Sequence, residues 1–491
     1  MQSVRFIDSA AMASSSRDRA ERQMFRVICF AIACACLPIT GIAQTERSAS
    51  APPPYQSLRY EEDWTYLSDK TKRSDTFDSL KYIPLNSRGW FLSMGGEARI
   101  RYEFFSQFNF GAGPQDDNGY LLQRYLLHAE THFGKHSRFF FQLQSGIENG
   151  RSGGPRPTDE DRLDIHQAFA DWKFGSEGRS ITVRVGRHEM EFGSGRLISA
   201  GEGLNVRRSF DGVRLIYQDR KWLINGQADK LVSIKPGIFD DARDRAQTFW
   251  GVGATRSNSK IGGGHQFAYI GLDRKMARFD RGIGREVRHS FIARTYGGAK
   301  QVDYNFDAIL QWGTFRGATK TDAIRAWAVA SDTGYTLKEI LFKPRIALRA
   351  DATSGDQNPN GGHLGTFNPL FPGTSYSDTI GLLGPSNTLA LDPYVRLAVN
   401  NRMSFTSGLA FFWRNSRRDG IYGINIAPLR TGQLSLARDI GSLYSARLDW
   451  RINRHWSYLL TYSYFNAGRF LKETPPGRDV NYVTSWAVFK F

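Results

Sequence analysis

The sequence predicts an all-β protein, a transmembrane antiparallel β-barrel of about 18 strands behind an N-terminal signal peptide. Apolar and polar residues alternate in a long series of segments, each of about 10 residues, the length of a strand that crosses a membrane at a tilt. Short and long connections alternate between these segments, and many of the 49 glycines lie in the connections. No apolar run of about 18 residues lies beyond the N-terminal segment, which argues against membrane helices.

The N-terminus has the pattern of a targeting signal. "RQMFR" is basic, "VICFAIACACLPITGIA" is apolar, and small residues precede a cleavage position after Ala43. We expect residues 1–43 to be a signal peptide. A membrane anchor is the alternative, but Pro38 interrupts the apolar run. All three cysteines lie in this segment, so we expect neither disulfides nor cysteine-bound zinc in the mature chain.

The mature chain divides into two parts. Residues 44–88 begin with the linker-like stretch "SASAPPPY" and are expected to form a periplasmic lead segment. Residues 89–491 carry the alternating segments and are expected to form an outer-membrane barrel. A closed barrel suits an exported chain without disulfides because its backbone hydrogen bonds close on themselves.

Three segments show the alternation most clearly: "EARIRYEFF" (97–105), "PRIALRAD" (344–351) and "SARLDWRI" (445–452). Each places apolar side chains on one face and mainly charged ones on the other. A soluble β-sandwich would also alternate. The strand length, the unequal connections and the aromatic residues near strand ends favour the barrel.

The connections alternate in length along the chain. Short ones lie near residues 134, 219 and 453; long ones cover 148–162, 231–246, 352–387 and 415–441. Outer-membrane barrels have short periplasmic turns and long outer loops, and an even strand number returns both chain ends to the periplasm. The pattern therefore indicates a bacterial outer membrane.

The chain ends in "NYVTSWAVFKF" (481–491). Period-2 spacing places Phe489 and Phe491 toward lipid and Lys490 toward the lumen. An aromatic residue at the end of the last strand resembles the signal that the barrel-assembly machinery reads. We therefore expect Phe489 and Phe491 to act in assembly.

The formal net charge is +17, and strand parity decides where this charge lies. An arginine facing lipid would cost about 2–4 kcal/mol at the membrane midplane, so stability alone favours inward placement. The expected lumen cations are Arg99, Arg101, Arg124, Arg184, Arg187, Arg196, Arg208, Arg214, Arg345, Arg349, Arg447, Arg451 and Lys490. Their expected acidic partners are Glu97, Glu103, Glu189, Asp211, Asp351 and Asp449. A net cationic, substrate-facing patch and a balanced salt-bridge lining are both compatible with this set.

Two further stretches have alternative interpretations. "GRHEMEFGSGRL" and "RRSFDGVRL" gather charges around a glycine-rich loop, either as part of a conduit or as an ion network that fixes the loop. "DQNPNG" (356–361) copies half of a calcium loop, but Phe367 stands where its final Glu is needed. The stretch is either a calcium-steadied outer loop or a loop that is merely rich in Gly and Asn, and we expect no metal.

Catalytic motifs are not found in the sequence. It contains no GxSxG, and "GRHEMEFG" is not HExxH, so no enzymatic activity and no cofactor are expected. The basic charge could also indicate binding to nucleic acid. An exported barrel would rarely meet nucleic acid, so we expect no such partner.

Five stretches resemble the alginate-export family of outer-membrane porins, in family order from about Leu58 to Phe491. They are "LRYEEDWTYLSDKTKRSDTFDSLKYIPLNSRGWFLSMGGEARIRYE" (58–103), "GRHEMEFGSGRLIS" (186–199), "RRSFDGVRL" (207–215), "SGDQNPNGGHLGTFNPLFPGTSY" (354–376) and "YSYFNAGRFLKETPPGRDVNY" (462–482). The resemblance implies an 18-stranded barrel whose electropositive lumen passes an acidic polysaccharide. Residues 255–340 contain no matching motif.

The expected function is an outer-membrane porin that passes an anionic, alginate-like polyuronate along lumen arginines through many weak sites. A general anion-selective porin for small acids or sugars is the alternative, and an outer-membrane lipid-modifying enzyme is a third hypothesis. The expected partners are outer-membrane lipid, the polysaccharide or small anions, the barrel-assembly machinery and periplasmic export proteins.

Overall fold

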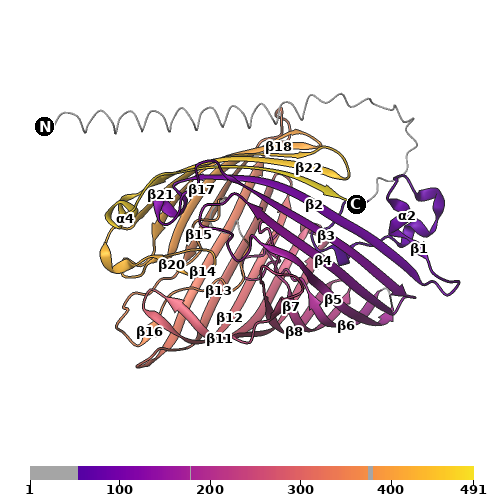
Figure 1. Ribbon diagram of the computed structural model, residues 1–491, viewed down its shortest axis with the longest axis horizontal. Coiled ribbons are helices and arrows are strands. Elements are labelled where there is room, and N and C mark those ends of the chain that lie inside the picture. Colours follow the sequence, from indigo (N-terminus) through magenta and orange to yellow (C-terminus); the bar gives the residue numbers. More distant parts are fainter. Residues whose placement is uncertain (1–52, 177, 374–379) are drawn as a thin grey trace. The chain divides into compact units, whose positions relative to one another are not determined.

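The computed structural model describes residues 53–491 except residue 177 and residues 374–379. The expected signal peptide, residues 1–43, lies outside the described residues. Within them, 18 long antiparallel strands pair in chain order, and β23 pairs with β2 to close a barrel (Figure 1). The predicted fold class and strand number are confirmed.

The barrel strands are β2 (Phe91–Ser106), β3 (Tyr120–Phe133), β4 (Ser137–Asn149), β5 (Asp161–Ser176), β6 (Arg179–His188), β7 (Phe210–Asp219), β8 (Trp222–Ser233), β10 (Gln247–Asn258), β11 (Gly263–Phe279), β12 (Gly282–Ala299), β13 (Val302–Arg316), β14 (Thr321–Thr336), β15 (Arg345–Thr353), β17 (Thr388–Asn400), β18 (Met403–Arg414), β21 (Asp439–Arg451), β22 (Trp456–Ala467) and β23 (Val480–Lys490). Short strands are β1 (Ile83–Pro84), β9 (Ala242–Arg243), β16 (His363–Leu364), β19 (Ile421–Tyr422) and β20 (Pro428–Arg430). The short helices are α2 (Asp78–Lys81), α3 (Phe108–Gly111) and α4 (Arg469–Glu473), with 3₁₀ turns at Arg59–Glu61, Thr65–Ser68, Lys70–Lys72, Ser259–Ile261 and Gly432–Leu434.

Side-chain alternation along β2 shows how the barrel wall is built. Arg99 and Arg101 are buried on its inner face, whereas Ile100 between them is 52% exposed on its outer face. Charged side chains thus face the lumen and apolar ones face outward, as a lipid-embedded strand requires. Among the described residues, no helix is both long and apolar enough to cross a membrane.

The two ends of the barrel differ in the length of their connections. At the end that holds the C-terminus, turns are short, as at 134–136, 220–221 and 401–402. The opposite end carries most of the long loops, which include 107–119, 150–160, 189–209, 234–246, 354–387, 415–438 and 468–479. The connections at 280–281 and 317–320 also lie there but are short, within the region where the sequence offered no motif. The end with short turns is the periplasmic one by the rule for such barrels.

The described part of the lead segment packs against the inner wall at the periplasmic end. The Tyr60 ring lies edge-on to Phe140 and Phe169, at centroid distances of 6.0 and 5.3 Å. Its hydroxyl donates to the Glu189 carbonyl at 2.9 Å. Buried aromatic surface and a satisfied hydroxyl hold the segment inside the barrel.

The C-terminus completes the barrel seam. The Phe491 amide donates to the Gly96 carbonyl at 3.0 Å, and Arg59 of the lead segment donates to the Phe491 carbonyl at 2.8 Å. A side chain at Gly96 would lie 2.7 Å from the Phe491 ring, so this close approach needs glycine. Phe77 contacts both the Phe489 and Phe491 rings, at 5.8 and 5.2 Å. The terminal aromatics therefore pack partly against the lead segment rather than only against lipid.

We predict that Phe491→Ser lowers the amount of folded protein in the outer membrane several-fold, because the seam loses the ring that packs on Gly96 and Phe77. The measurement is the fraction of heat-modifiable barrel in purified outer membranes. Phe174→Ser, which removes an outward aromatic that is 60% exposed on β5, is the control. Equal folded fractions for both variants and the native chain would contradict the assembly role.

Candidate functional site

The connection between β6 and β7, residues 189–209, folds into the barrel and is called the lumen loop below. Arg99 on β2 donates to the carbonyls of Glu202 and Leu204 at 2.8 and 2.6 Å. Arg101 donates to the Gly203 carbonyl at 2.5 Å. Two wall arginines therefore bind the backbone of the loop and not a solute.

A chain of charges, buried except for Glu202 with its 43% exposed side chain, continues this attachment. Arg124 pairs with Glu97 at 2.5 Å and with Glu202 at 2.7 Å. Arg207 pairs with Glu202 at 2.6 Å and with Glu189 at 2.5 Å. Burial by itself would raise the pKa of Glu202, but Arg124 and Arg207 outweigh it and hold that pKa below its usual range. Glu202 therefore stays ionised between two guanidinium groups.

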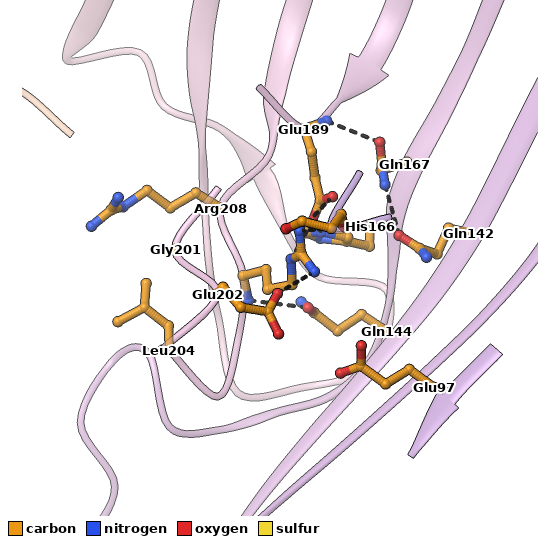
Figure 2. A network of polar contacts seen from close by, with 12 residues as sticks. Glu97, Gln142, Gln144, His166, Gln167, Glu189, Gly201, Glu202, Leu204 and Arg208 are labelled. Carbon is orange, nitrogen blue, oxygen red and sulfur yellow. Dashed lines mark hydrogen bonds and ion pairs between the residues drawn. The ribbon is translucent and has the colours of Figure 1, made fainter. Parts of the chain in front are cut away.

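Neutral amides surround the charged chain (Figure 2). The Glu189 amide donates to Gln167 at 3.0 Å, and Gln167 donates to Gln142 at 2.7 Å. Gln144 accepts from the Arg207 amide at 3.1 Å. Because the charged and amide groups find partners inside the wall, the network fixes the base of the loop in one arrangement.

The other end of the lumen loop reaches the opposite wall. Arg196 pairs with Asp307 on β13 at 3.1 Å and with Asp351 on β15 at 2.8 Å. Arg208, which points away from the network in Figure 2, donates to the Phe371 carbonyl at 3.1 Å. Burial lowers the pKa of Arg208 to about 10. Since β2 and β13 lie on roughly opposite sides of the strand order, the loop crosses the lumen.

Apolar packing fills the lumen on one side of this crossing. Ile198 of the loop and Phe371 belong to one buried cluster with the inward side chains Phe249, Ile270 and Ile309 of β10, β11 and β13. Close packing of this kind leaves no room for a solute. Open space lies on the other side, along β15, β17, β18 and β21 to β23 and beside the periplasmic ends of β13 and β14, and is called the open sector below.

Two neighbouring cavities of about 660 and 580 Å³ occupy the open sector and share Arg396 and Asp449 in their walls. The larger is lined by equal numbers of aspartate and arginine side chains. They are Asp303, Asp332, Asp392, Asp449, Arg345, Arg349, Arg396 and Arg447. Most of them form ion pairs with one another: Arg345–Asp303 at 2.5 Å and Arg349–Asp392 at 2.8 Å between strands, and Arg447–Asp449 at 2.6 Å within β21.

The smaller cavity lies toward the periplasmic turns, and there cations outnumber carboxylates. Arg396, Arg402 and Arg451 donate to the Ser404 hydroxyl and to the carbonyls of Ile452 and Asn401, at 3.3, 3.3 and 3.1 Å. Lys490 completes this group, 3.4 Å from Glu97. The positive charge of the three arginines is therefore not neutralised by these contacts. Arg396, Arg402, Arg451 and Lys490 are called the periplasmic mouth below.

The structure divides the sequence-predicted cations into three groups. Those that line the open sector are Arg345, Arg349, Arg447, Arg451 and Lys490. Those held in the filled part of the lumen or against the lumen loop are Arg99, Arg101, Arg124, Arg184, Arg196, Arg208 and Arg214. Arg187 pairs with Asp211 at 2.9 Å, and strand alternation places both on the face of β6 and β7 opposite to Arg184 and Arg214.

The predicted acids are likewise divided between buried ion pairs, the open sector and the outer face of the barrel. Glu103 pairs with Arg101, Asp351 with Arg196, Glu97 with Arg124 and Glu189 with Arg207, all in buried positions, whereas Asp449 faces the open sector. Because Arg187 and Asp211 do not face the lumen, both leave the set of conduit residues. Only the members that reach an open surface are able to meet a solute.

Sequence reasoning missed several residues of the site. Arg396 follows Asp392 and Tyr394 at period 2 in "DPYVRL", so strand parity alone would have placed it inward. Arg402 lies in a turn and Glu202 in a loop, where no periodicity applies. Their positions depend on tertiary folding and not on a local pattern.

The sequence model of a family described as "Alginate export" matches residues 91–485. The chain belongs to the alginate-export family. The comparison with curated proteins found no match to this chain. Its fold is similar to that of OccK5 (OpdH) of Pseudomonas aeruginosa, with TM-score 0.53 and 10% identity over 82% of this chain and 98% of that one.

Two further solved structures show the same likeness. OpdK of Pseudomonas aeruginosa matches with TM-score 0.55 and 8% identity over 81% of this chain and 98% of that one. OccAB1 of Acinetobacter baumannii matches with TM-score 0.54 and 13% identity over 81% of this chain and 96% of that one. Identities this low show the fold alone. Family and fold together establish a bacterial outer-membrane channel.

We predict that Arg207→Gln loosens the lumen loop and raises single-channel conductance, with larger current fluctuations. Removing one partner of a buried ion pair costs about 3–5 kcal/mol, because Glu189 stays buried without its guanidinium partner, whereas Glu202 keeps Arg124. Planar-bilayer recording of the refolded variant is the measurement. Arg162→Gln, at a side chain 70% exposed on β5, is the control. Native conductance and noise in a folded Arg207→Gln barrel would show that the network does not hold the loop.

Proposed function

We propose that this alginate-export family channel passes an anionic polysaccharide, an alginate-like polyuronate, through its open sector. The observation that carries the proposal is the periplasmic mouth, where the guanidinium groups of Arg396, Arg402 and Arg451 have no carboxylate partner among the described residues. Low-dielectric walls focus such a field and raise the local concentration of anions. The charge therefore favours entry of a polyanion from the periplasmic side.

Beyond the mouth, the wall offers arginines that already bind aspartate. A uronate carboxylate that displaces Asp392 from Arg349, or Asp449 from Arg447, gains one charged hydrogen bond as another is lost. Exchange of this kind keeps each site weak, which multi-site conduction needs. Repulsion from the displaced aspartate then favours onward movement of the polymer.

At the outer end, the inward side chains of the open sector are buried beneath the long loops. Phe412 and Leu443 of the wall pack in one apolar cluster with Leu382, Phe470 and Leu471 of the loops and α4. A polymer that leaves the cell therefore requires these loops to part. The apolar character of the cluster favours closure when no chain is in transit.

A general anion-selective porin for small acids or sugars is the second candidate. The equal numbers of arginine and aspartate in the larger cavity favour it, because a balanced wall holds a polyanion weakly. OpdK, whose fold is similar, has been solved with vanillate. Monomeric uronate and polyuronate separate the candidates: an export channel is blocked by the polymer at far lower uronate concentration than by the monomer.

We predict that replacing Arg396, Arg402 and Arg451 by Gln lowers anion-over-cation selectivity and weakens current block by polyuronate added to the periplasmic side. The change removes three charges of the mouth and leaves the buried network intact. Reversal potentials in a salt gradient and the polymer concentration for half-block are the measurements. Both effects are expected to shrink at high salt, because ions screen the mouth.

The matched control removes the same charge from the outer surface, with Arg162, Arg417 and Arg418 replaced by Gln. These three side chains are exposed and lie away from the periplasmic mouth. If the control and the mouth variant change selectivity and half-block equally, the mouth has no special role and the export proposal fails.

A further inference from the structure

The loop between β8 and β10, residues 234–246, folds back onto the outer end of β5. Its Gly237 carbonyl accepts from the Leu163 amide at 3.4 Å, and its Phe239 amide donates to the Leu163 carbonyl at 2.9 Å. This pairing adds a short parallel stretch beside β5. It carries Asp240 and Asp241 of the loop to Asp164 of the strand.

The three aspartates offer carboxylate oxygens that all lie within 4.8 Å of one another. Oxygen ligands at about 2.3–2.6 Å from one calcium ion lie at most about 5 Å apart, so carboxylate oxygens within 4.8 Å of one another are able to share one ion. The backbone amide of Asp241 donates a hydrogen bond to the Oδ2 carboxylate oxygen of Asp164 at 2.9 Å. Backbone pairing and this hydrogen bond fix the relative positions of loop and strand.

A fourth carboxylate is an independent sign of a cation. Asp161 on β5 is fully buried, and within the described part of the chain neither of its oxygens has a hydrogen-bond partner of normal geometry, although the Gln144 amide lies nearby. Asp161 stands three residues before Asp164 on the same strand, opposite Gly146 of β4, whereas Asp164 stands opposite Gln144, so both lie at the outer end of β5. A buried carboxylate without a partner is costly unless a charge neutralises it.

The protein cations nearby are already engaged. Arg187 lies 3.7 Å from Asp164 but directs its Nε to Asp211 at 2.9 Å. Arg243 is also turned to Asp211, at 3.6 Å. The cluster thus retains an excess of negative charge that a bound divalent ion would neutralise.

We propose that Asp164, Asp240 and Asp241, supported by Asp161, bind one calcium ion that fastens loop 234–246 to the outer end of β5. Calcium accepts an irregular set of carboxylate, carbonyl and water oxygens, which suits a site made from a strand end and a loop. The two parts of the site are separated by about 75 residues of sequence. This site is distinct from the half-motif at residues 356–361, whose Asp356 pairs with Arg281 at 2.8 Å.

The test is isothermal titration of the chelator-stripped, refolded barrel in detergent with calcium chloride. The native chain and the control Asp117→Asn, an exposed acid in another outer loop, are expected to bind one ion each. The double variant Asp240→Asn, Asp241→Asn is expected to bind at least tenfold more weakly. Both replaced side chains belong to the loop, so the barrel strands are untouched, and unboiled gel mobility checks that the barrel has folded.

Trypsin provides a second readout. Arg243 and Arg245 are exposed in the same loop, and calcium should slow cleavage there at least tenfold in the native chain and in Asp117→Asn, but not in the double variant. Absence of calcium binding by the folded native chain would overturn the proposal. Equally tight binding by the double variant, or cleavage of the native loop that calcium does not change, would also overturn it.

Discussion

The attachment of the lumen loop to both walls is the constraint on which the rest of the interior depends. A barrel of 18 strands would enclose a wide aqueous channel if its interior were unfilled. Arg124 and Arg207 bind the base of the loop through Glu202, and Arg196 binds its far end to β13 and β15. These ion pairs determine which half of the lumen is packed and which half remains open.

Burial explains why so many charges serve structure here. A guanidinium group removed from water needs other partners, and Arg99 finds backbone carbonyls of the loop, the Asn205 side-chain oxygen and the face of Trp486. Such a residue cannot release its partners to bind a passing solute without a large cost. In Arg396, Arg402 and Arg451, by contrast, the contacts are single hydrogen bonds at the edge of an open cavity. Exposure, and not the number of arginines, separates structural from solute-facing charge.

The sequence was sufficient for the wall of the barrel but not for its interior. Alternation in "EARIRYEFF" is a local property of a strand with lipid on one side, so strand parity predicts the inward positions of Arg99 and Arg101. The same pattern contains no information about the loop that covers them, because residues 189–209 reach β2 only through tertiary folding. The prediction that Arg187 faces the lumen was wrong for a related reason. It rested on the charged residues nearby in the sequence, whereas strand alternation relative to Arg184 places Arg187 on the other face of β6.

Cysteine labelling tests most directly whether solutes pass through the open sector, and the three native cysteines all lie within residues 29–36, in the expected signal peptide. Thr406→Cys places a thiol in the open sector, and Leu126→Cys places one at a buried position of β3, opposite Glu97 of the network that holds the lumen loop. Conductance is recorded before and after a charged methanethiosulfonate reagent is added. We predict rapid labelling and a clear fall in current for Thr406→Cys, and neither for Leu126→Cys. Equal labelling and equal loss of current at the two positions would contradict a lumen divided by the loop.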